Sequence, residues 1–271
     1  MNLIFCLIGF VLSVQTANAQ AIRPKIINGQ DADSQDPVSK STIAIQMPNL
    51  NNGVMQYPRC TAFVIKENVL MTAAHCLVFL SDKSGVQAIL ALAPKFGLDD
   101  GKQKRISLSD FRIHPDYYAN DSGVYNDVAL IKLKESLPSY YQVLNFNWDL
   151  DSALAAGQDL IVAGFGTTID FEQSDTLPPR LRFTGVPFIG GDKNPFQDSA
   201  QLLVDQSKAG FCSGDSGGPL YFQSGMQLTP IGIVSHVTQN SNGNWSCKAN
   251  GAFTRISFFK SWILQALSEL N

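Results

Sequence analysis

The residue with the clearest chemical potential is Ser216, which lies in the sequence Gly-Asp-Ser-Gly-Gly-Pro at residues 214–219. A serine hydroxyl is a weak nucleophile unless a neighbouring base accepts its proton. Glycines let the backbone approach a substrate closely and adopt dihedral angles that other residues avoid. In a tight turn, the backbone N–H groups of Gly214 and Ser216 could stabilise an oxyanion. The motif alone also fits an ordinary glycine-rich turn.

Two further segments offer a base and an acid. His75, one of 3 histidines, lies in Thr-Ala-Ala-His-Cys at residues 72–76. Asp127 comes just before the apolar run at residues 128–131, where a buried carboxylate would fix the tautomer of an imidazole and stabilise the imidazolium. Taken singly, such a histidine is usually structural and such an aspartate usually begins a turn. Together with Ser216 they make a set that is capable of nucleophilic catalysis.

An all-β scaffold must position these residues. Short runs of β-branched and aromatic residues, separated by clusters of Gly, Pro, Asn and Asp, predict strands. The clearest runs cover residues 42–45, 62–65, 128–131, 160–163 and 219–222. Turn-forming residues at this frequency favour a β-sandwich or a β-barrel.

The remaining segments give two further expectations. Apolar residues recur at three- and four-residue spacing over residues 257–270, which predicts one amphipathic helix packed on the barrel. Residues 185–210 have no clear register, and we expect a loop there.

Composition and the first residues indicate an exported protein. With 271 residues, 45% hydrophobic and 16% charged, the chain can bury a sizeable core. A net charge of −3 offers no basic stripe for nucleic acid. The apolar run at residues 3–14 precedes Ala-Asn-Ala at residues 17–19, which predicts a signal peptide over residues 1–19. That run is too short for a membrane anchor, which needs about 20 apolar residues. We therefore expect secretion, to the extracellular space or a bacterial periplasm, with no membrane association.

Cysteine usage agrees with an oxidising compartment. Of 5 cysteines, Cys6 lies in the expected signal peptide, which leaves Cys60, Cys76, Cys212 and Cys247 for two disulfides. Spacing alone leaves all three possible pairings open. A zinc site is the other use of such residues, but no Cys-x-x-Cys pair occurs. We expect no metal and no organic cofactor.

The three chemical segments, in this order, resemble those of the trypsin/chymotrypsin family of serine proteases, peptidase S1. The resemblance runs from residue 26 to the final helix and rests on Ala-Ala-His-Cys, Asp-Val-Ala-Leu and Gly-Asp-Ser-Gly-Gly-Pro. It implies a chymotrypsin-like, all-β fold with two six-stranded antiparallel β-barrels, a cleft between them and a C-terminal α-helix. His75 would be the general base and then acid, Asp127 the orienting carboxylate and Ser216 the nucleophile, with an oxyanion hole at Gly214 and Ser216.

The resemblance also implies cross-links and an activation step. It pairs Cys60 with Cys76 and Cys212 with Cys247. Ile-Ile-Asn-Gly at residues 26–29 resembles the family's activation sequence, which implies a short propeptide at residues 20–25, a protease domain at residues 26–271 and an activating protease. Cleavage after Lys25 would free the α-amino group of Ile26. That ammonium would pair with Asp215, because a buried carboxylate without a cation is costly.

A specificity pocket is implied at six positions: Gly210, Phe211, Ser235, His236, Val237 and Gly251. Gly210 lies where trypsin-like members carry the aspartate that binds Arg or Lys, so no pocket for basic residues is implied. Val237 replaces a glycine and resembles the elastases, Gly251 keeps the opposite wall small, and Phe211 could fill the base. We expect a small or medium apolar residue at P1, the position before the cleaved bond. His236 replaces a tryptophan, and its role stays open.

Two other functions compete with a protease. Residues 214–218 also fit the Gly-x-Ser-x-Gly pattern of α/β-hydrolase lipases and esterases, but that fold needs the order Ser, acid, His and a helix directly after the serine. A non-catalytic binding protein could keep the protease fold, although such proteins usually lose a member of the triad. We expect protein or peptide substrates and a monomer.

Overall fold

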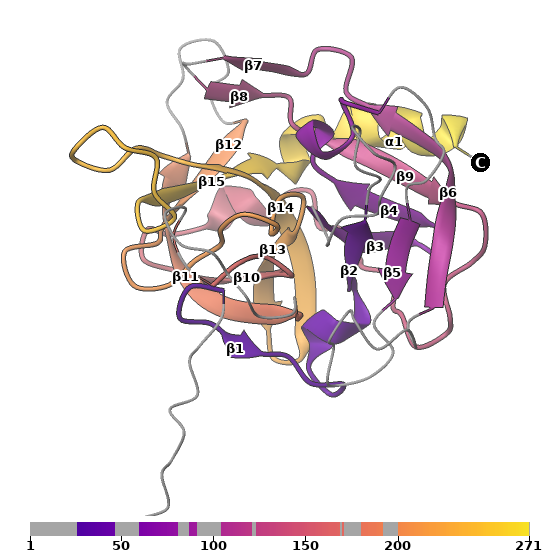
Figure 1. The fold of residues 1–271 in the computed structure, drawn as a ribbon, viewed down its shortest axis with the longest axis horizontal. Coiled ribbons are helices and arrows are strands. Elements are labelled where there is room, and N and C mark those ends of the chain that lie inside the picture. The colour runs from indigo at the N-terminus through magenta and orange to yellow at the C-terminus, as the bar shows by residue number, and fades with distance from the viewer. Residues whose placement is uncertain are drawn as a thin grey trace, which may run out of the picture.

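The computed structural model describes residues 26–46, 60–80, 87–90, 104–120, 123–168, 170, 180–191 and 200–270. The predicted signal peptide at residues 1–19 and the propeptide at residues 20–25, including Lys25, lie outside the described residues. Figure 1 shows two strand-rich halves side by side, the first coloured indigo to magenta and the second mainly salmon to orange.

The first half is a closed antiparallel barrel with the strand order β2-β3-β4-β9-β6-β5. Its strands are β2 (Thr42–Gln46), β3 (Cys60–Lys66), β4 (Val69–Thr72), β5 (Gln87–Leu90), β6 (Lys104–Ile113) and β9 (Ala129–Leu133). Every residue of β2 is buried, because its two faces meet different cores. Ile43 and Ile45 point into the barrel, whereas Ala44 packs in a cluster with Phe165 and Tyr221 from the other half.

The second half is a seven-stranded antiparallel sheet with the order β1-β11-β10-β13-β14-β15-β12. The C-terminal part of β11 also pairs with β12. This pairing connects the second strand in the order, β11, with the last strand, β12. Its strands are β1 (Gln30–Asp31), β10 (Asp159–Gly164), β11 (Arg182–Gly191), β12 (Gln201–Asp205), β13 (Pro219–Ser224), β14 (Gln227–Val237) and β15 (Asn250–Arg255).

The expectation of a loop over residues 185–210 is wrong for much of that segment, because β11 and β12 occupy it. Four Gly and Pro residues in β11 hide its alternation, although Val186 and Phe188 are buried at two-residue spacing. Pairing with β10 supplies the register, and a bulge between Phe188 and Gly190 shifts it. Tertiary pairing therefore overrides the local signal for a loop.

Shorter elements connect and cover the sheets. They are η1 (Pro37–Lys40), η2 (Ala74–Cys76), η3 (Leu150–Ala153), η4 (Ile256–Phe259), the hairpin of β7 (Tyr118–Asn120) and β8 (Gly123–Tyr125), and α1 (Lys260–Glu269). The predicted C-terminal helix is present, but its first turn is the 3-10 turn η4. Ile263 and Ala266 of α1 are buried in the core of the first barrel.

Contacts between the halves define where a cleft can form. The Tyr221 hydroxyl of β13 lies 2.8 Å from Ser41 Oγ, and Thr61 Oγ1 of β3 donates to the Gly214 carbonyl over 3.0 Å.

The helix α1 follows the second sheet but packs on the first barrel. The predicted all-β architecture with a C-terminal helix is confirmed. Within the described residues, no helix is long and apolar enough to cross a membrane.

Candidate active site

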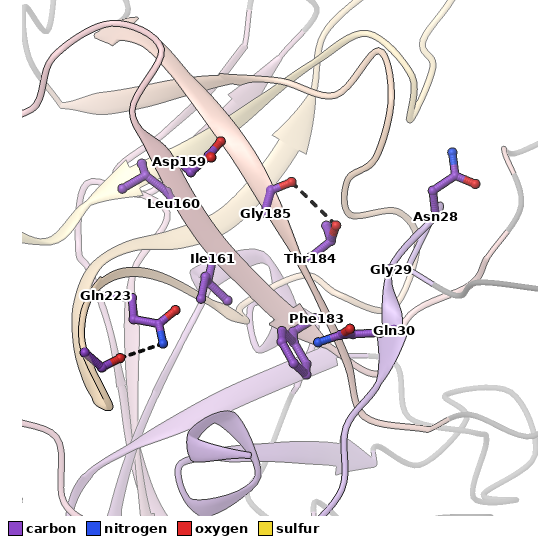
Figure 2. A pocket seen from close by; sticks show the side chains of 11 residues that line it. Asn28, Gly29, Gln30, Asp159, Leu160, Ile161, Phe183, Thr184, Gly185 and Gln223 are labelled. Carbon is purple, nitrogen blue, oxygen red and sulfur yellow. Dashed lines mark hydrogen bonds between the residues drawn. The ribbon is translucent and has the colours of Figure 1, made fainter.

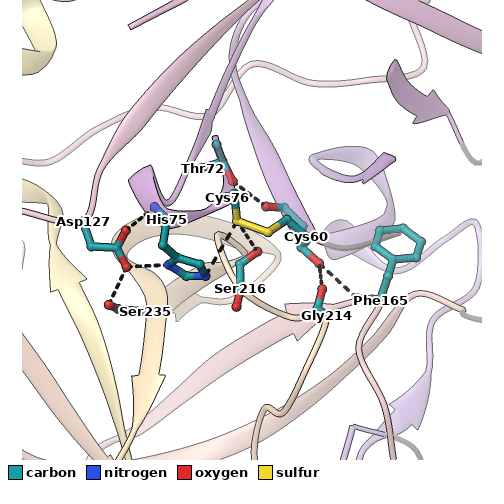
Figure 3. Close-up of a disulfide and its surroundings, with 10 residues drawn as sticks. Cys60, Thr72, His75, Cys76, Asp127, Phe165, Gly214, Ser216 and Ser235 are labelled. Carbon is teal, nitrogen blue, oxygen red and sulfur yellow. Dashed lines mark hydrogen bonds and ion pairs between the residues drawn. A yellow bond between two sulfur atoms is a disulfide. The ribbon is translucent and has the colours of Figure 1, made fainter. Parts of the chain in front are cut away.

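A histidine and an aspartate from the first barrel form the centre of the candidate site. His75 lies in η2 directly after β4, and Asp127 lies two residues before β9. These strand ends are neighbours, because Thr72 pairs with Ala129. The His75 backbone N–H donates to Asp127 Oδ1 over 2.9 Å, and His75 Nδ1 lies 2.8 Å from Asp127 Oδ2 (Figure 3). An ionised carboxylate only accepts, so Nδ1 carries the proton and Nε2 has a free lone pair when the ring is neutral.

The backbone around Asp127 is shaped to turn its side chain inward. Asn126 has a φ of 54°, a conformation that asparagine tolerates better than most residues. The Asn126 amide donates to the Asp116 carbonyl over 2.7 Å and fixes this turn. Thr254 of β15, in the second half, donates from Oγ1 to the backbone carbonyl of Asp127 over 3.0 Å. Asp127 is therefore held by both halves.

The charged form of Asp127 is stabilised although its side chain is fully buried. Burial is the largest single effect and raises the pKa, but the charge of His75 and the hydrogen bonds from His75 and Ser235 outweigh it together, so the pKa of Asp127 is lowered. Ser235 Oγ donates to Asp127 Oδ2 over 2.6 Å. The carboxylate thus accepts three hydrogen bonds and remains an anion at neutral pH.

The imidazole responds in the opposite direction. Burial is the largest single effect on His75 and lowers its pKa, but the charge of Asp127 and the hydrogen bond to it outweigh burial, so the pKa of His75 is raised above the ordinary 6.5. The His75 side chain keeps 27% of its surface exposed. It is therefore a base that remains accessible and that holds a proton more firmly than a free histidine.

Ser216 lies on the side of the imidazole away from Asp127 in Figure 3. The Cys76 sulfur lies 3.9 Å from His75 Nε2 and 3.7 Å from the Ser216 carbonyl oxygen, so the two residues are near neighbours. The Ser216 carbonyl also accepts from the Thr61 N–H over 2.7 Å. A strand of the first barrel therefore holds the backbone of the serine turn near the histidine.

The turn that carries Ser216 requires glycine at two positions. Gly214 and Gly217 have φ values of 95° and 80°, and a Cβ at Gly217 would lie 2.0 Å from Thr72 Oγ1. Among the described residues, no acceptor takes the N–H of Gly214 or of Ser216. Two backbone donors in one tight turn are suited to an oxyanion.

A pocket of about 240 Å³ opens beside this group. It is lined by Phe211, Cys212, Ser213, Ser216, Ser235, His236, Val237 and Trp245. The predicted residues Phe211, Ser235, His236 and Val237 therefore meet at the candidate nucleophile. The other two predicted positions, Gly210 and Gly251, lie against the Gln206 side chain at the base of this region.

A larger hollow of about 860 Å³ lies on the second sheet (Figure 2). Its walls come from β1, β10, β11 and the β13–β14 hairpin, and Asp159 is the one titratable residue among those that line it. The residues that line this hollow include no serine, cysteine or histidine, the residues that most often serve as nucleophile and base in acyl transfer. The smaller pocket beside Ser216 is therefore the candidate active site.

Comparison with known proteins assigns the family. The family model described as Trypsin matches residues 27–263. The chain belongs to the trypsin family. The match spans both halves of the fold and the residues that line the pocket beside Ser216. As a member, the chain is a serine-type endopeptidase, a hydrolase that acts on protein substrates.

Individual members of the trypsin family are similar over most of the chain. Chymotrypsin-like elastase family member 1 of Bos taurus is 28% identical and covers 86% of this chain and 88% of its own length. The chymase of Mus musculus is 30% identical, with 78% and 79% covered. Mast cell protease 2 of Meriones unguiculatus is 32% identical over the same shares of the two chains, 78% and 79%.

Two disulfides brace the trypsin-family site, and both predicted pairings are confirmed. Cys60 is bonded to Cys76, which ties the histidine turn to β3. Cys212 is bonded to Cys247, which joins two walls of the pocket. In the part of the chain that the structure describes, both groups of side chains with a metal-like arrangement contain these cysteines, and a disulfide sulfur is not the thiolate that binds zinc.

Asp215 is a buried carboxylate within the serine turn. It accepts from the N–H groups of Gly166 and Cys212 over 2.7 and 2.9 Å. Burial is the largest effect and raises the pKa of Asp215 to about 7, against the lowering effect of these bonds and of the Arg182 charge. A buried carboxyl group with so high a pKa gains from any cation that reaches it.

The segment expected to supply that cation is docked close to the pocket. Ile26 is fully buried, and the Ile27 carbonyl accepts from the Gly210 N–H over 3.1 Å. Asn28 has a φ of 58°, and its amide donates to the Lys208 carbonyl. The pairing of a free Ile26 amino group with Asp215, and cleavage after Lys25, stay predictions.

Sequence reasoning missed three hydrogen bonds that position the site. The bond from Ser235 to Asp127 crosses 108 positions in sequence, and Asp170 accepts from Ser246 Oγ and the Cys247 N–H over 2.7 and 3.0 Å. Neither Ser235 nor Asp170 stands in a local pattern that marks these bonds. Only the three-dimensional fold brings the partners together.

Proposed function

We propose that this chain is a secreted serine endopeptidase that hydrolyses internal peptide bonds through His75, Asp127 and Ser216. The observation that carries the proposal is the buried, ionised Asp127 bonded to Nδ1 of His75, with Ser216 on the far side of the ring. This arrangement leaves Nε2 of His75 as the atom that accepts a proton. A base oriented in this way is what a serine nucleophile needs.

In the first chemical step, Ser216 Oγ attacks the carbonyl carbon of the scissile bond while His75 Nε2 takes the hydroxyl proton. The carbonyl oxygen becomes an oxyanion that accepts from the N–H groups of Gly214 and Ser216. Asp127 stabilises the imidazolium through Nδ1. The negative charge of the oxyanion therefore faces fixed donors, and the positive charge of the imidazolium faces a fixed acceptor, Asp127.

The tetrahedral intermediate then collapses to an acyl-enzyme. His75 gives its proton to the leaving amine, the C–N bond breaks, and Ser216 Oγ remains esterified to the new acyl group. Water next attacks the ester with His75 as the base, which releases the acid and restores the Ser216 hydroxyl. No electron transfer is involved, and every proton passes through Nε2 of one histidine.

Activation by cleavage after Lys25 is part of the proposal. The new ammonium of Ile26 would meet Asp215, whose buried carboxyl group lacks a full counter-charge, and would hold the turn at residues 214–218. The hydrogen bond between Ile27 and Gly210 supports this route, because it already ties the N-terminal segment to the pocket loop. A signal peptide at residues 1–19 would direct the proenzyme to secretion.

The proposed P1 preference is for small or medium apolar side chains. Val237 is buried at the pocket wall and Phe211 is buried at its base, so both reduce the space for a substrate side chain. Gly210 offers no carboxylate for Arg or Lys. Apolar pockets discriminate by about 1–3 kcal/mol per methylene, or roughly 10- to 200-fold.

The proposal is tested on the proenzyme after cleavage at Lys25, with a peptide library varied at P1 and Ser216→Ala as the control. We expect cleavage after Ala, Val or Leu that disappears in the control. Cleavage after Arg or Lys would contradict the pocket assignment alone. No cleavage by a protein with a free Ile26 would favour a non-catalytic binding protein.

A further inference from the structure

Gln206 is a fully buried polar residue that follows β12 and has no part in the mechanism above. Its side chain is 0% exposed and points toward the loop that carries Phe211. Oε1 accepts from the Phe211 N–H over 2.8 Å, and Nε2 donates to the Cys247 carbonyl over 3.3 Å and to the Phe211 carbonyl over 3.5 Å. A buried amide is tolerated only when it is bonded in this way.

The position of this amide matters because two glycines of the predicted pocket face it. A Cβ on Gly210 would lie 2.3 Å from Gln206 Oε1, and a Cβ on Gly251 would lie 2.8 Å from Gln206 Cδ. The same Cβ on Gly251 would lie 2.5 Å from Cε1 of Phe211. The space above both glycines is therefore already filled by Gln206 and Phe211.

Phe211 separates this amide from the open pocket. The residue lines the pocket with Ser216 and Val237, yet it is only 2% exposed. Its ring packs edge-on against Phe253, with the ring centroids 5.0 Å apart. The ring is thus held from one side by Phe253, while Gln206 holds the backbone of Phe211.

We propose that Gln206 determines specificity by supporting Phe211 as a raised floor, so that the pocket accepts only short aliphatic P1 side chains such as Ala and Val. This inference rests on the proposed function and narrows its substrate class. Gln206 is a positioning residue, because it acts through the phenyl ring. An aromatic P1 side chain would have to displace the ring of Phe211.

The chemistry of the floor also excludes basic substrates. Both N–H bonds of the Gln206 amide are used by carbonyl groups, and the amide carries no charge. Gln206 would therefore offer no counter-charge to a Lys or Arg at P1, which disfavours the burial of such a side chain on this floor.

Bonds to the backbone of residue 211 make this inference testable. Because Gln206 binds the Phe211 N–H and carbonyl and not its ring, Phe211→Ser removes the floor and keeps the support. Gln206→Ala removes the support and keeps the ring. Gln227→Ala is the matched control, because Gln227 is an exposed glutamine at the start of β14 in the same sheet.

The readout is the ratio of kcat/KM for P1 Ala to that for P1 Phe in otherwise identical peptides, with the protein cleaved after Lys25. General loss of stability lowers both values together and leaves their ratio unchanged. We expect wild type and Gln227→Ala to favour Ala by at least about tenfold. Phe211→Ser and Gln206→Ala should each reduce that ratio by about tenfold or more.

Equal turnover of the two peptides by wild type would overturn the inference. An unchanged ratio in both Phe211→Ser and Gln206→Ala would overturn it as well. If only Gln206→Ala leaves the ratio unchanged, Phe211 is the floor and the role given to Gln206 is wrong.

A binding measurement separates failure of this inference from failure of the proposed function. Ser216→Ala protein is titrated by calorimetry with peptides that end in Ala or in Phe, which probes the pocket without chemistry. A preference for Ala that Phe211→Ser abolishes supports the floor even if wild type hydrolyses no peptide. Equal binding of the two peptides overturns the floor, whatever the wild-type activity.

Discussion

At the scale of single residues, the site depends on a balance between burial and pairing. Asp127 and His75 are each disfavoured as ions by burial, and each is restored by the other. Their separation of 2.8 Å and the further bond from Ser235 decide the balance in favour of the charged pair. The pair therefore favours the imidazolium that peptide hydrolysis would transiently form.

This balance predicts the acidic limb of the pH profile. His75 must be neutral to accept a proton, so kcat/KM should rise with pH as the imidazolium loses its proton. Because the pKa of His75 is raised above 6.5, the midpoint should lie above that value. Initial rates on one P1 Ala peptide across pH 5–9 measure it, and a midpoint below the ordinary histidine value would contradict the electrostatic argument.

Asp127→Asn provides the matched variant. It removes the charge that raises the pKa of His75 and leaves the effect of burial, so an NMR titration of the ring should show a lower pKa than in wild type. The variant should also lose kcat on the order of 10⁴-fold, the size known for this change in the family's triad.

Sequence reasoning at this scale worked where residues lie in compact motifs. His75, Asp127 and Ser216 each stand in a segment whose neighbours mark it, and the structure brings His75 and Asp127 into contact. Gln206 could not be found in this way. Its role depends on two glycines and a carbonyl that reach it from three separate segments, and no sequence spacing encodes that meeting.

At the scale of elements, the serine turn between Cys212 and β13 is shaped by glycine. Gly217 sits against Thr61 and Thr72 of the first barrel, where a Cβ would lie 2.5 Å from the Thr61 carbonyl oxygen. The turn can approach β3 and β4 only because it lacks side chains there. Close backbone packing thus brings a second-half serine to a first-half histidine.

Gly217→Ala should therefore destabilise the protein through both strain and collision. A left-handed backbone costs a non-glycine residue about 1–2 kcal/mol, and the clash with Thr61 and Thr72 adds about 1–3 kcal/mol. Urea unfolding measures the sum. Gly225→Ala is the control, because Gly225 has a φ of 60° and a Cβ added there would meet nothing within 4 Å, so it should show the backbone cost alone. Equal losses in the two variants would refute the collision.

A strand can be predicted from the sequence when its apolar residues form an uninterrupted run, and it is missed when Gly and Pro break that run. The apolar runs of β3, β9 and β10 were predicted because β-branched residues follow one another between turn signals. β11 was missed because Gly185, Pro187 and two further glycines interrupt it, and its pairing with β10 and β12 comes from distant segments. The start of α1 was misplaced by a few residues, since the 3-10 turn η4 has the same apolar spacing.

At the scale of the whole molecule, the two halves are interlocked around the site. The N-terminal strand β1 pairs with β11 of the second sheet, while α1 at the other end packs on the first barrel. His75 and Asp127 lie in the first half and Ser216 lies in the second, so the candidate site is where the two halves meet. Sequence motifs could supply this overall order, whereas the seven-stranded pairing of the second sheet emerged only from the structure.

Cleavage after Lys25 should change how the stability of the whole molecule depends on pH. In the uncleaved chain the pKa of Asp215 is raised to about 7, whereas an unfolded Asp titrates near about 3.9. Between these values the folded state keeps a proton that the unfolded state has lost. The free energy of unfolding should therefore fall as pH rises from about 4 to about 7.

After cleavage, the Ile26 ammonium should lower the pKa of Asp215 and remove most of that fall. Urea unfolding of the two forms at several pH values in this window measures the difference, and Asp215→Asn in the uncleaved chain should also lack the fall. A parallel pH dependence of the cleaved and uncleaved proteins would argue against the proposed ion pair.

The most direct test of the central claim is the reaction of the cleaved protein with a phosphonylating reagent, followed by mass spectrometry of its peptides. If Ser216 is a nucleophile activated by His75, one phosphonyl group should attach to Ser216, and the rate should follow the pH dependence of kcat/KM. Neither Ser216→Ala nor the protein unfolded in urea should react at that peptide. An unlabelled Ser216 in the cleaved, folded protein, or labelling as fast in a His75→Ala variant, would contradict the account.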